Sequence, residues 1–214
     1  MSDFQQARQK FYELRCEKAA ESLHENGFNA VVAKDREDAA AKILELIGPE
    51  DEVGIPGTVT VRELGLDKAL QERGNRTIEH WGADREKMRQ LRLEQINSDV
   101  LLTGTNAVSL DGKLVNIDGT GNRVGGMIFG PERAIIVAGA NKIADDLDAA
   151  KKRARRVAGP INAIRLSTES PCAETGYCVD CESSKTICRV TVIMDKKPGG
   201  IDATVVLIPE ELGY

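Results

Sequence analysis

Aromatic residues are scarce in this chain of 214 residues, where Phe, Tyr and Trp together make up only 4%. Hydrophobic residues of all kinds still account for 41%, so the core is expected to be built mainly from aliphatic side chains. Long apolar runs are also missing, because the best ones, residues 134–140 and 203–209, have only the length of strands. The polar N-terminal segment lacks the apolar stretch of a signal peptide. We therefore expect a cytoplasmic protein without a membrane partner.

An excess of positive charge is absent as well. The 29 Lys and Arg residues are outnumbered by 34 Asp and Glu residues, which leaves a net charge of −5. Proteins that bind the phosphate backbone of nucleic acids usually carry the opposite sign. The basic run at residues 151–156 follows several aspartates on the same expected helix, an order that suits the helix dipole. The charge pattern therefore predicts no nucleic-acid partner.

Cysteine is rare but unevenly distributed. Cys16 stands alone near the N-terminus, whereas the other four cysteines lie within 17 residues. These four are Cys172, Cys178, Cys181 and Cys188. A secreted disulfide scaffold would spread its cysteines along a short chain, whereas a local cluster in an acidic chain of this length is typical of a metal site. We therefore predict that residues 172–188 form a cysteine-rich, metal-binding segment.

The spacing Cys-x5-Cys-x2-Cys-x6-Cys bears on which metal is bound. Soft thiolate ligands select iron–sulfur clusters or zinc. Structural zinc sites usually contain two pairs of closely spaced ligands, and only one such pair, Cys-x-x-Cys, is present here. The spacing thus favours an iron–sulfur cluster, such as a 4Fe–4S cluster, over the alternative of zinc. Four buried or disulfide-paired cysteines are the interpretation without a metal.

Hydrophobic periodicity predicts helices and strands that alternate along the chain. Helices are expected at residues 4–27, 35–47, 60–70, 84–96, 121–129 and 145–158, and strands at residues 28–33, 51–55, 77–81, 99–103, 134–138, 190–194 and 203–208. Residues 106–118 are expected to form a β-hairpin around Asp111-Gly112. This alternation predicts an α/β fold with a mostly parallel sheet covered by helices on both faces. We expect residues 1–214 to form a single domain, with Gly159-Pro160 before the cysteine-bearing tail.

The segment at residues 54–63 predicts one side of a ligand site. A strand ends there, a glycine turn follows, and Thr60 with Glu63 forms a capping-box pattern that opens a helix. The amides of a helix N-terminus attract anions, and Gly57, Thr58 and Thr60 would add close backbone approach and hydroxyl donors. A carboxylate or phosphate group is the expected ligand. An ordinary turn with a threonine cap is the alternative.

A second stretch, residues 103–126, is dense in small and polar side chains. Open α/β sheets bind ligands beyond the carboxyl ends of their strands, and this stretch follows one such end. The candidate substrate-binding residues there are Thr105, Asn106, Asp111, Asn116, Gly121 and Asn122. Asp118 and His80 are the candidates for a catalytic acid or base. The alternatives are that Gly and Asn only make turns and that the histidine is structural.

The polar segments together resemble the lactate-utilisation (LUD) domain family. Residues 57–65, 103–108, 111–116 and 121–124 carry the resemblance in matching order and spacing, and it extends over roughly residues 4–158. It implies a Rossmann-like sheet like that of the sugar-phosphate isomerase and CoA-transferase superfamily. It also implies a connection to the oxidation of lactate to pyruvate, in which family members work beside iron–sulfur partner proteins. The cysteine tail departs from the general family pattern and looks like the mark of a distinct subgroup.

The leading hypothesis is a subunit of a system that oxidises lactate or a related hydroxy acid, and hence an oxidoreductase component. One alternative is an isomerase-like or transferase-like enzyme that acts on a small phosphorylated or acyl substrate and carries a structural metal. Another is a non-catalytic module that senses iron or oxidants through its cysteines. The expected partners are the small substrate, iron–sulfur subunits and, by default, a second copy in a homodimer.

Overall fold

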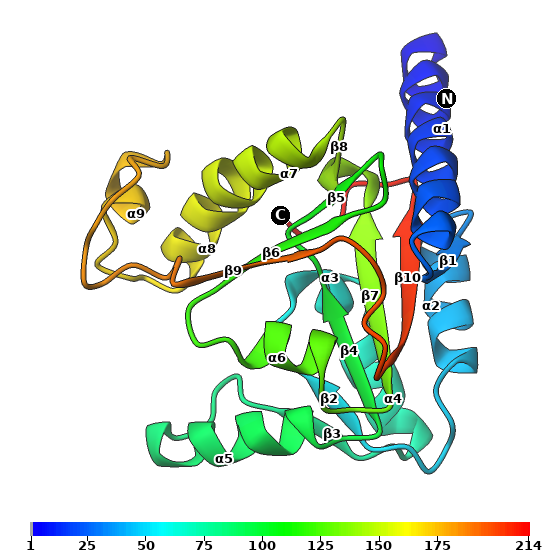
Figure 1. The fold of residues 1–214 in the computed structure, drawn as a ribbon. Helices are drawn as coiled ribbons and strands as arrows, with labels where there is room; N and C mark the ends of the chain where they lie inside the picture. Colours follow the sequence, from blue (N-terminus) through cyan, green and yellow to red (C-terminus); the bar gives the residue numbers. More distant parts are fainter. Residues whose placement is uncertain (1) are drawn as a thin grey trace.

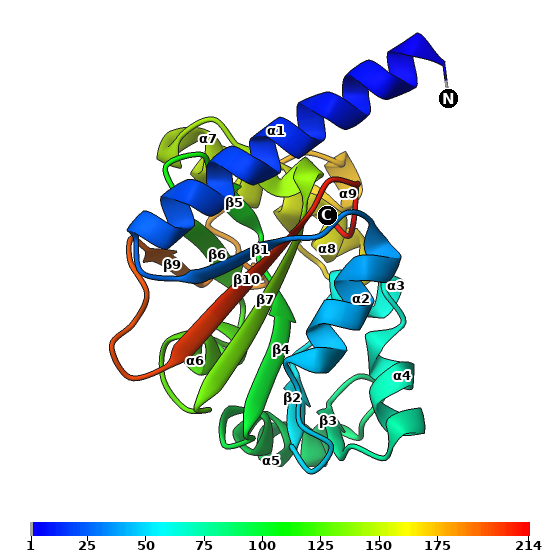
Figure 2. The same ribbon diagram turned by 90° about the vertical axis from the view of Figure 1, so that its right-hand side faces the viewer.

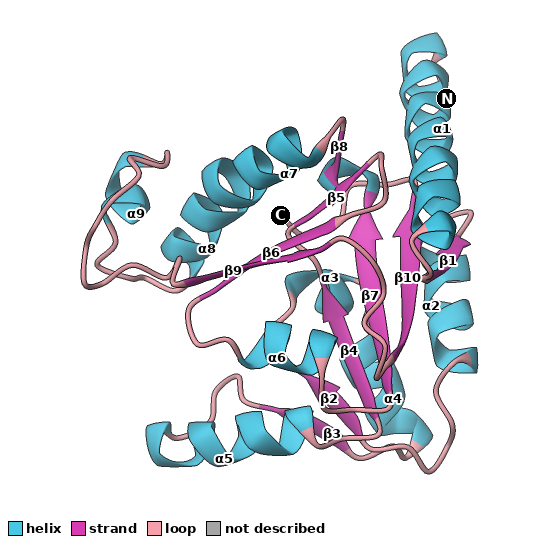
Figure 3. Ribbon diagram, in the orientation of Figure 1, coloured by secondary structure: helices cyan, strands magenta, loops and turns pink. Residues whose placement is uncertain are grey.

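The computed structural model describes residues 2–214, which form two β-sheets with helices packed around them (Figures 1 and 3). The α-helices are α1 (Asp3–Glu25), α2 (Arg36–Glu45), α3 (Val59–Glu63), α4 (Leu66–Arg73), α5 (Arg85–Ile96), α6 (Asn122–Ile128), α7 (Leu147–Arg153), α8 (Gly159–Arg165) and α9 (Pro171–Thr175). A 3-10 turn, η1 (Ala140–Lys142), and a π-helical turn, η2 (Ala154–Ala158), complete the helical elements of this range. The strands are β1 (Asn29–Val32), β2 (Val53–Ile55), β3 (Thr77–Glu79), β4 (Val100–Gly104), β5 (Ala107–Ser109), β6 (Leu114–Asp118), β7 (Arg133–Gly139), β8 (Ile143–Ala144), β9 (Val190–Met194) and β10 (Asp202–Ile208).

The main sheet has six strands in the order β1-β10-β7-β4-β2-β3, and every pair in it is parallel. Successive side chains of the central strands point to opposite faces of the sheet, and hydrophobic residues on both faces explain why both are covered. In β7, Ala134 and Ile136 belong to one hydrophobic core, while Ile135 and Val137 belong to the other. Helix α1 and the second sheet cover the first face, and α2, α3 and α4 cover the second (Figure 2). The predicted α/β fold with a mostly parallel sheet is confirmed.

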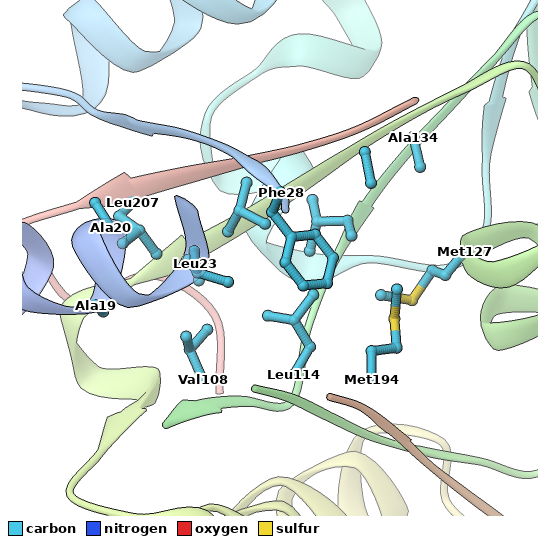
Figure 4. Packing of buried hydrophobic residues seen from close by; sticks show 14 of the residues in the cluster. Ala19, Ala20, Leu23, Phe28, Val108, Leu114, Met127, Ala134, Met194 and Leu207 are labelled. Carbon is cyan, nitrogen blue, oxygen red and sulfur yellow. The ribbon is translucent and has the colours of Figure 1, made fainter. Parts of the chain in front are cut away.

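The second sheet contains four strands in the order β8-β5-β6-β9. Strands β5 and β6 form the expected antiparallel hairpin, and β9 adds to β6 in the antiparallel sense. Leu114 and Val108 of this hairpin pack against Leu23 and Phe28 beneath the main sheet, as Figure 4 shows. The hairpin therefore lies fixed against the fold at the point where its polar residues emerge.

Gly112 in the hairpin turn lies directly against the backbone of α1. Its φ is +77°, and a Cβ atom there would come within 2.5 Å of the Ser22 carbonyl oxygen. We expect Gly112→Ala to lower the free energy of unfolding by about 2–3 kcal/mol, because backbone strain and overpacking add. Gly74 is the matched control, since its φ is +99° but nothing lies within 4 Å of an added Cβ. Gly74→Ala should cost only about 1 kcal/mol in urea unfolding; equal losses would contradict the close packing.

The prediction of one helix at residues 60–70 is wrong in two respects. The first helix begins one residue earlier, and the segment forms two helices, α3 and α4, instead of one. Thr58, not Thr60, is the N-cap, and its hydroxyl accepts a hydrogen bond from the Val61 amide. Gly65 then adopts φ +66°, which ends α3 and allows α4 to begin in a new direction. Thr58 and Thr60 are equivalent as capping residues in sequence terms, and only the tertiary setting distinguishes them.

The helix expected at residues 145–158 extends further than the pattern indicates. The chain passes from α7 through the π-helical turn η2 directly into α8, so Gly159-Pro160 does not end the helical run. A proline inside a regular α-helix clashes with the preceding turn, and the wider π-turn relieves that clash. The short α9 and β8 were not expected either. Among residues 2–214, none of the helices combines the length and apolarity needed to cross a membrane.

Candidate functional site

A cleft with a volume of about 590 Å³ opens at the carboxyl ends of β2, β4 and β7. The chain segments that follow these strands line one side, and α8 with residues 187–188 lines another. The C-terminus lies between α3 and α8 (Figure 1), because the Gly213 amide donates to Glu63 and the Tyr214 hydroxyl donates to Asn162. Cavities of this size at strand carboxyl ends are the usual ligand sites of open α/β sheets.

Gly57 begins the wall of the cleft beyond β2. A Cβ atom on Gly57 would lie 2.8 Å from the indole Nε1 of Trp81, so glycine allows the close approach of that ring. Two guanidinium groups lie over the same ring, with the Arg62 carbon 4.2 Å and the Arg165 carbon 4.6 Å from its centroid. Helix α3 itself has only 5 residues, and the Thr58 side chain caps it. Charged side chains, more than the helix end, therefore define the electrostatics of the cleft.

Lys142 emerges as a central residue of the cleft. It follows β7 through η1, is 3% exposed, and donates a hydrogen bond of 2.7 Å from Nζ to the Thr60 hydroxyl. Burial, together with the charges of Arg153 and Arg123, lowers the pKa of Lys142 to about 7, while Glu63 opposes the shift. No ion pair joins Lys142 to a carboxylate within residues 2–214. The sequence signal was present, since the lysine stands just beyond the carboxyl end of a buried strand.

Two arginines approach the cleft from α5 and α8. Arg92 is partly buried, its Nε atom has no hydrogen-bond partner, and no carboxylate of residues 2–214 pairs with it. Arg165 donates from Nε to the Tyr214 hydroxyl at 2.6 Å and also to Asn162, both of which are neutral. Burial lowers the pKa of His80, with Arg92 lowering it further, so the imidazole at neutral pH is mainly uncharged.

Arg123 organises the polar residues that follow β4 and β6. Its guanidinium forms a buried ion pair with Asp118, with 2.7 Å between Nη2 and Oδ1, and donates to Asn106 at 3.0 Å. It also donates to the side-chain oxygen of Asn116. The second carboxylate oxygen of Asp118 accepts the Val124 amide at 3.1 Å. Because both oxygens of Asp118 accept hydrogen bonds from within the protein, this carboxylate holds the polar residues of the site together.

The cleft brings together most of the residues that the sequence pointed to. Those that line it are Gly57, Thr58, Thr60, His80, Thr105, Asn106, Asp118 and Asn122. Asn116 is fully buried just behind this wall. Asp111 lies apart on the hairpin turn, where it pairs with Lys113, and Gly121 precedes α6 outside the lining. The lining residues that sequence reasoning missed include Lys142, Arg92, Arg165, Asn162 and Tyr214.

The four clustered cysteines line one small cavity next to the cleft, and Cys188 lines both spaces. All four are free thiols. Burial raises the pKa of Cys172, and the neighbouring thiols of Cys181 and Cys178 raise it further. As the side chains stand, no group of three or more His, Cys, Asp or Glu residues within residues 2–214 has a metal-binding arrangement. Cys16 is separate and buried in the main core.

The fold and the cleft define an α/β protein with an open parallel sheet whose polar site lies at the strand carboxyl ends. The family model of the LUD domain matches residues 16–208. The chain therefore belongs to the lactate-utilisation (LUD) domain family, as the polar motifs predicted.

One solved structure supports this fold, and two others are similar over about half of the chain. A DUF162 family protein from Deinococcus radiodurans matches with a TM-score of 0.53 and 12% identity, covering 92% of this chain and 97% of that chain. Ribose 5-phosphate isomerase from Plasmodium falciparum matches with a TM-score of 0.36 and 20% identity, over 51% of this chain and 52% of its own. The delta subunit of eIF2B from Chaetomium thermophilum has a TM-score of 0.34 and 14% identity, over 56% and 54%. No curated protein matches the chain.

Proposed function

We propose that the cleft binds a small organic acid and that the protein is a subunit of a system that oxidises lactate, or a related hydroxy acid, to pyruvate. One observation carries this proposal: Lys142, Arg92 and Arg165 line the cleft, and no carboxylate of residues 2–214 pairs with them. Membership of the LUD domain family supports the choice of lactate as the acid.

Charge balance favours an anionic ligand. The whole chain carries a net charge of −5, yet the charge of the cleft lining is positive. Its one lining carboxylate, Asp118, is already neutralised by Arg123. Lys142 is buried and Arg92 is half-buried, and taking a cation out of water without a partner is costly. These two cations, together with the more exposed Arg165, favour a ligand that brings the negative charge. A carboxylate meets this need, and its two oxygens suit the planar guanidinium fork.

Oxidation of a hydroxy acid also requires a proton acceptor and an electron acceptor. His80 is the better placed of the two candidate bases, because it lines the cleft and is mainly uncharged, whereas both oxygens of Asp118 are engaged. The electrons would pass to an iron–sulfur centre, on the cysteine-rich segment of this chain or on partner subunits of the kind that family members work beside.

A second candidate function follows from the size of the cleft. Its volume of about 590 Å³ exceeds what a three-carbon acid fills. An isomerase-like or transferase-like reaction on a small phosphorylated or acyl substrate would use the same cations to hold a phosphate group. Comparing acids with sugar phosphates in one binding assay distinguishes the two candidates.

Calorimetric titration tests the proposed function. We expect lactate and pyruvate to bind, and propane-1,2-diol, which lacks the carboxylate, to bind far more weakly. Arg92→Met should weaken acid binding by about 10- to 100-fold, because a charge-assisted hydrogen bond contributes about 1.5–3 kcal/mol. Arg89→Met is the matched control, since Arg89 is exposed on the same helix and does not line the cleft. Equal binding of the diol, or an equal loss in the control, would refute the proposal, and preferential binding of ribose 5-phosphate would favour the second candidate.

A further inference from the structure

The four cysteines of the tail converge although they lie on different elements. Cys172 lies on α9, Cys178 and Cys181 lie in the loop that follows, and Cys188 lies just before β9. All of them line the same small cavity, together with Arg155 from η2. No disulfide explains why the four thiols lie close together, because all four cysteines are free. It places four soft sulfur donors around one enclosed space.

The segment that carries these cysteines has almost no hydrophobic core of its own. Within residues 171–189, Cys172 is the only buried residue, and the side chains of Tyr177 and Val179 are largely exposed. Segments that cannot bury enough apolar surface usually depend on a disulfide or a metal for their order. Because the thiols form no disulfide, a bound metal is the remaining means of ordering this segment.

The local backbone conformation also favours metal binding by the cysteine sulfur atoms. The Asp180 amide donates a hydrogen bond to the Cys178 sulfur at 3.4 Å, within the Cys-x-x-Cys pair. Asp180 adopts φ +48°, a left-handed conformation that is uncommon for a residue other than glycine. Amide hydrogen bonds to cysteine sulfur stabilise the thiolate form that metals require. The Arg155 guanidinium lines the same cavity, where it also pairs with Asp180 at 3.6 Å, and places a positive charge near the four thiols.

We propose that Cys172, Cys178, Cys181 and Cys188 coordinate one metal centre, and that this centre forms part of the wall of the ligand cleft. The donor set of four thiolates without histidine suits an iron–sulfur cluster or zinc, and the spacing favours the cluster. As the side chains stand, these thiols do not have a metal-binding arrangement within residues 2–214, so coordination requires the thiols, or the exposed segment that carries them, to move. The proposal concerns a site separate from the cationic residues and does not depend on the identity of the acid.

The connection to the cleft comes from the residues that the two cavities share. Gly159, Ile187 and Cys188 line both spaces. A Cβ atom on Gly119, which also lines the cleft, would lie 3.3 Å from the Ile187 carbonyl oxygen. A metal bound through Cys188 would therefore fix the position of residues 187–188 against the cleft. Metal content and the shape of the ligand site are thus linked through the backbone.

Metal analysis of the full chain, purified without oxygen, tests the proposal without any added acid. Iron with acid-labile sulfide and visible absorbance would identify an iron–sulfur cluster, whereas zinc in a colourless protein would identify a zinc site. Either result supports a single thiolate-ligated centre. Absence of both metals from the purified protein, and failure to take up either on reconstitution with ferrous iron and sulfide or with zinc, would overturn it.

Variants separate coordination from general effects on folding. Cys181→Ser should lower the bound metal by about tenfold or more, because one thiolate ligand is lost. Cys16→Ala is the matched control, since Cys16 is buried in the main core far from this cavity. The control should retain its metal, and circular dichroism should report folded protein for both variants. Retention of metal by Cys181→Ser, or an equal loss in Cys16→Ala, would contradict the assignment.

Discussion

Arg123→Met is expected to lower the free energy of unfolding by about 3–5 kcal/mol, because it leaves the buried carboxylate of Asp118 without its partner. The side chains of Arg123 and Asp118 are only 14% and 7% exposed. The guanidinium also donates to Asn106 and Asn116 and to the carbonyl oxygens of Gly104 and Ile117, so several buried acceptors would lose their donor together. Urea unfolding followed by circular dichroism measures the loss.

Arg76 provides the control for this prediction. It pairs with Glu52 at the surface, where its side chain is 57% exposed, so Arg76→Met should cost no more than about 1 kcal/mol. The double variant Arg123→Met with Asp118→Asn should recover part of the stability, since the unpaired charge is then removed. If Arg123→Met and Arg76→Met unfold at the same urea concentration, the buried network does not support the fold as described.

Lys142→Met should weaken binding of the acid by roughly 100-fold or more, because a buried charge partner of the ligand is removed. It should also remove a pH dependence. In the free protein the pKa of Lys142 is about 7, and a bound carboxylate would raise it, so binding is accompanied by proton uptake. Affinity of the parent protein should therefore be greatest below pH 7. Above pH 7 it should fall by up to about tenfold per pH unit.

Stability provides an independent measurement on the same variant. The folded-state pKa of about 7 lies below the unfolded value of 10.5, so the unfolded chain binds the additional proton. Lys142 therefore opposes folding most strongly below pH 7, and this opposition is relieved as the pH rises from about 7 toward 10.5. Lys142→Met should be more stable than the parent at pH 6 while losing the ligand. Lys152→Met, a change at an exposed lysine on α7, should alter neither property; a flat pH profile in the parent would exclude this role for Lys142.

The sequence predicted those features of the fold that depend on local chemistry. Strand β7 was found because an apolar run of that length fits a buried parallel strand, and the hairpin was found because Asp111-Gly112 supplies a residue with positive φ. The family was also predicted, since each of its motifs is a short continuous stretch of sequence, and the family model that matches covers residues 16–208. Local patterns did not reveal that β9 pairs with β6 in a second sheet, because strand partners are chosen by tertiary packing.

The cleft could be predicted only in part for the same reason. Thr58 and Thr60 both line the cleft as predicted, but the helix cap was assigned to Thr60 instead of Thr58, because either hydroxyl satisfies the local pattern. Lys142 was missed because a lysine in a sequence is normally exposed, and its burial arises from the segments that pack over η1. Gly159-Pro160 was read as a boundary because the π-turn that accommodates the proline has no sequence signature. The metal and the ligand roles of the named residues remain predictions that the experiments above test.

Trp81 has a practical consequence that follows from its position. It is the single tryptophan of the chain, it lines the cleft, and the guanidinium groups of Arg62 and Arg165 lie over its ring. Indole emission depends on the charges and the water around the ring. The intrinsic tryptophan fluorescence of the unmodified protein therefore originates from one place only, and the protein carries its own optical probe in the lining of the cleft.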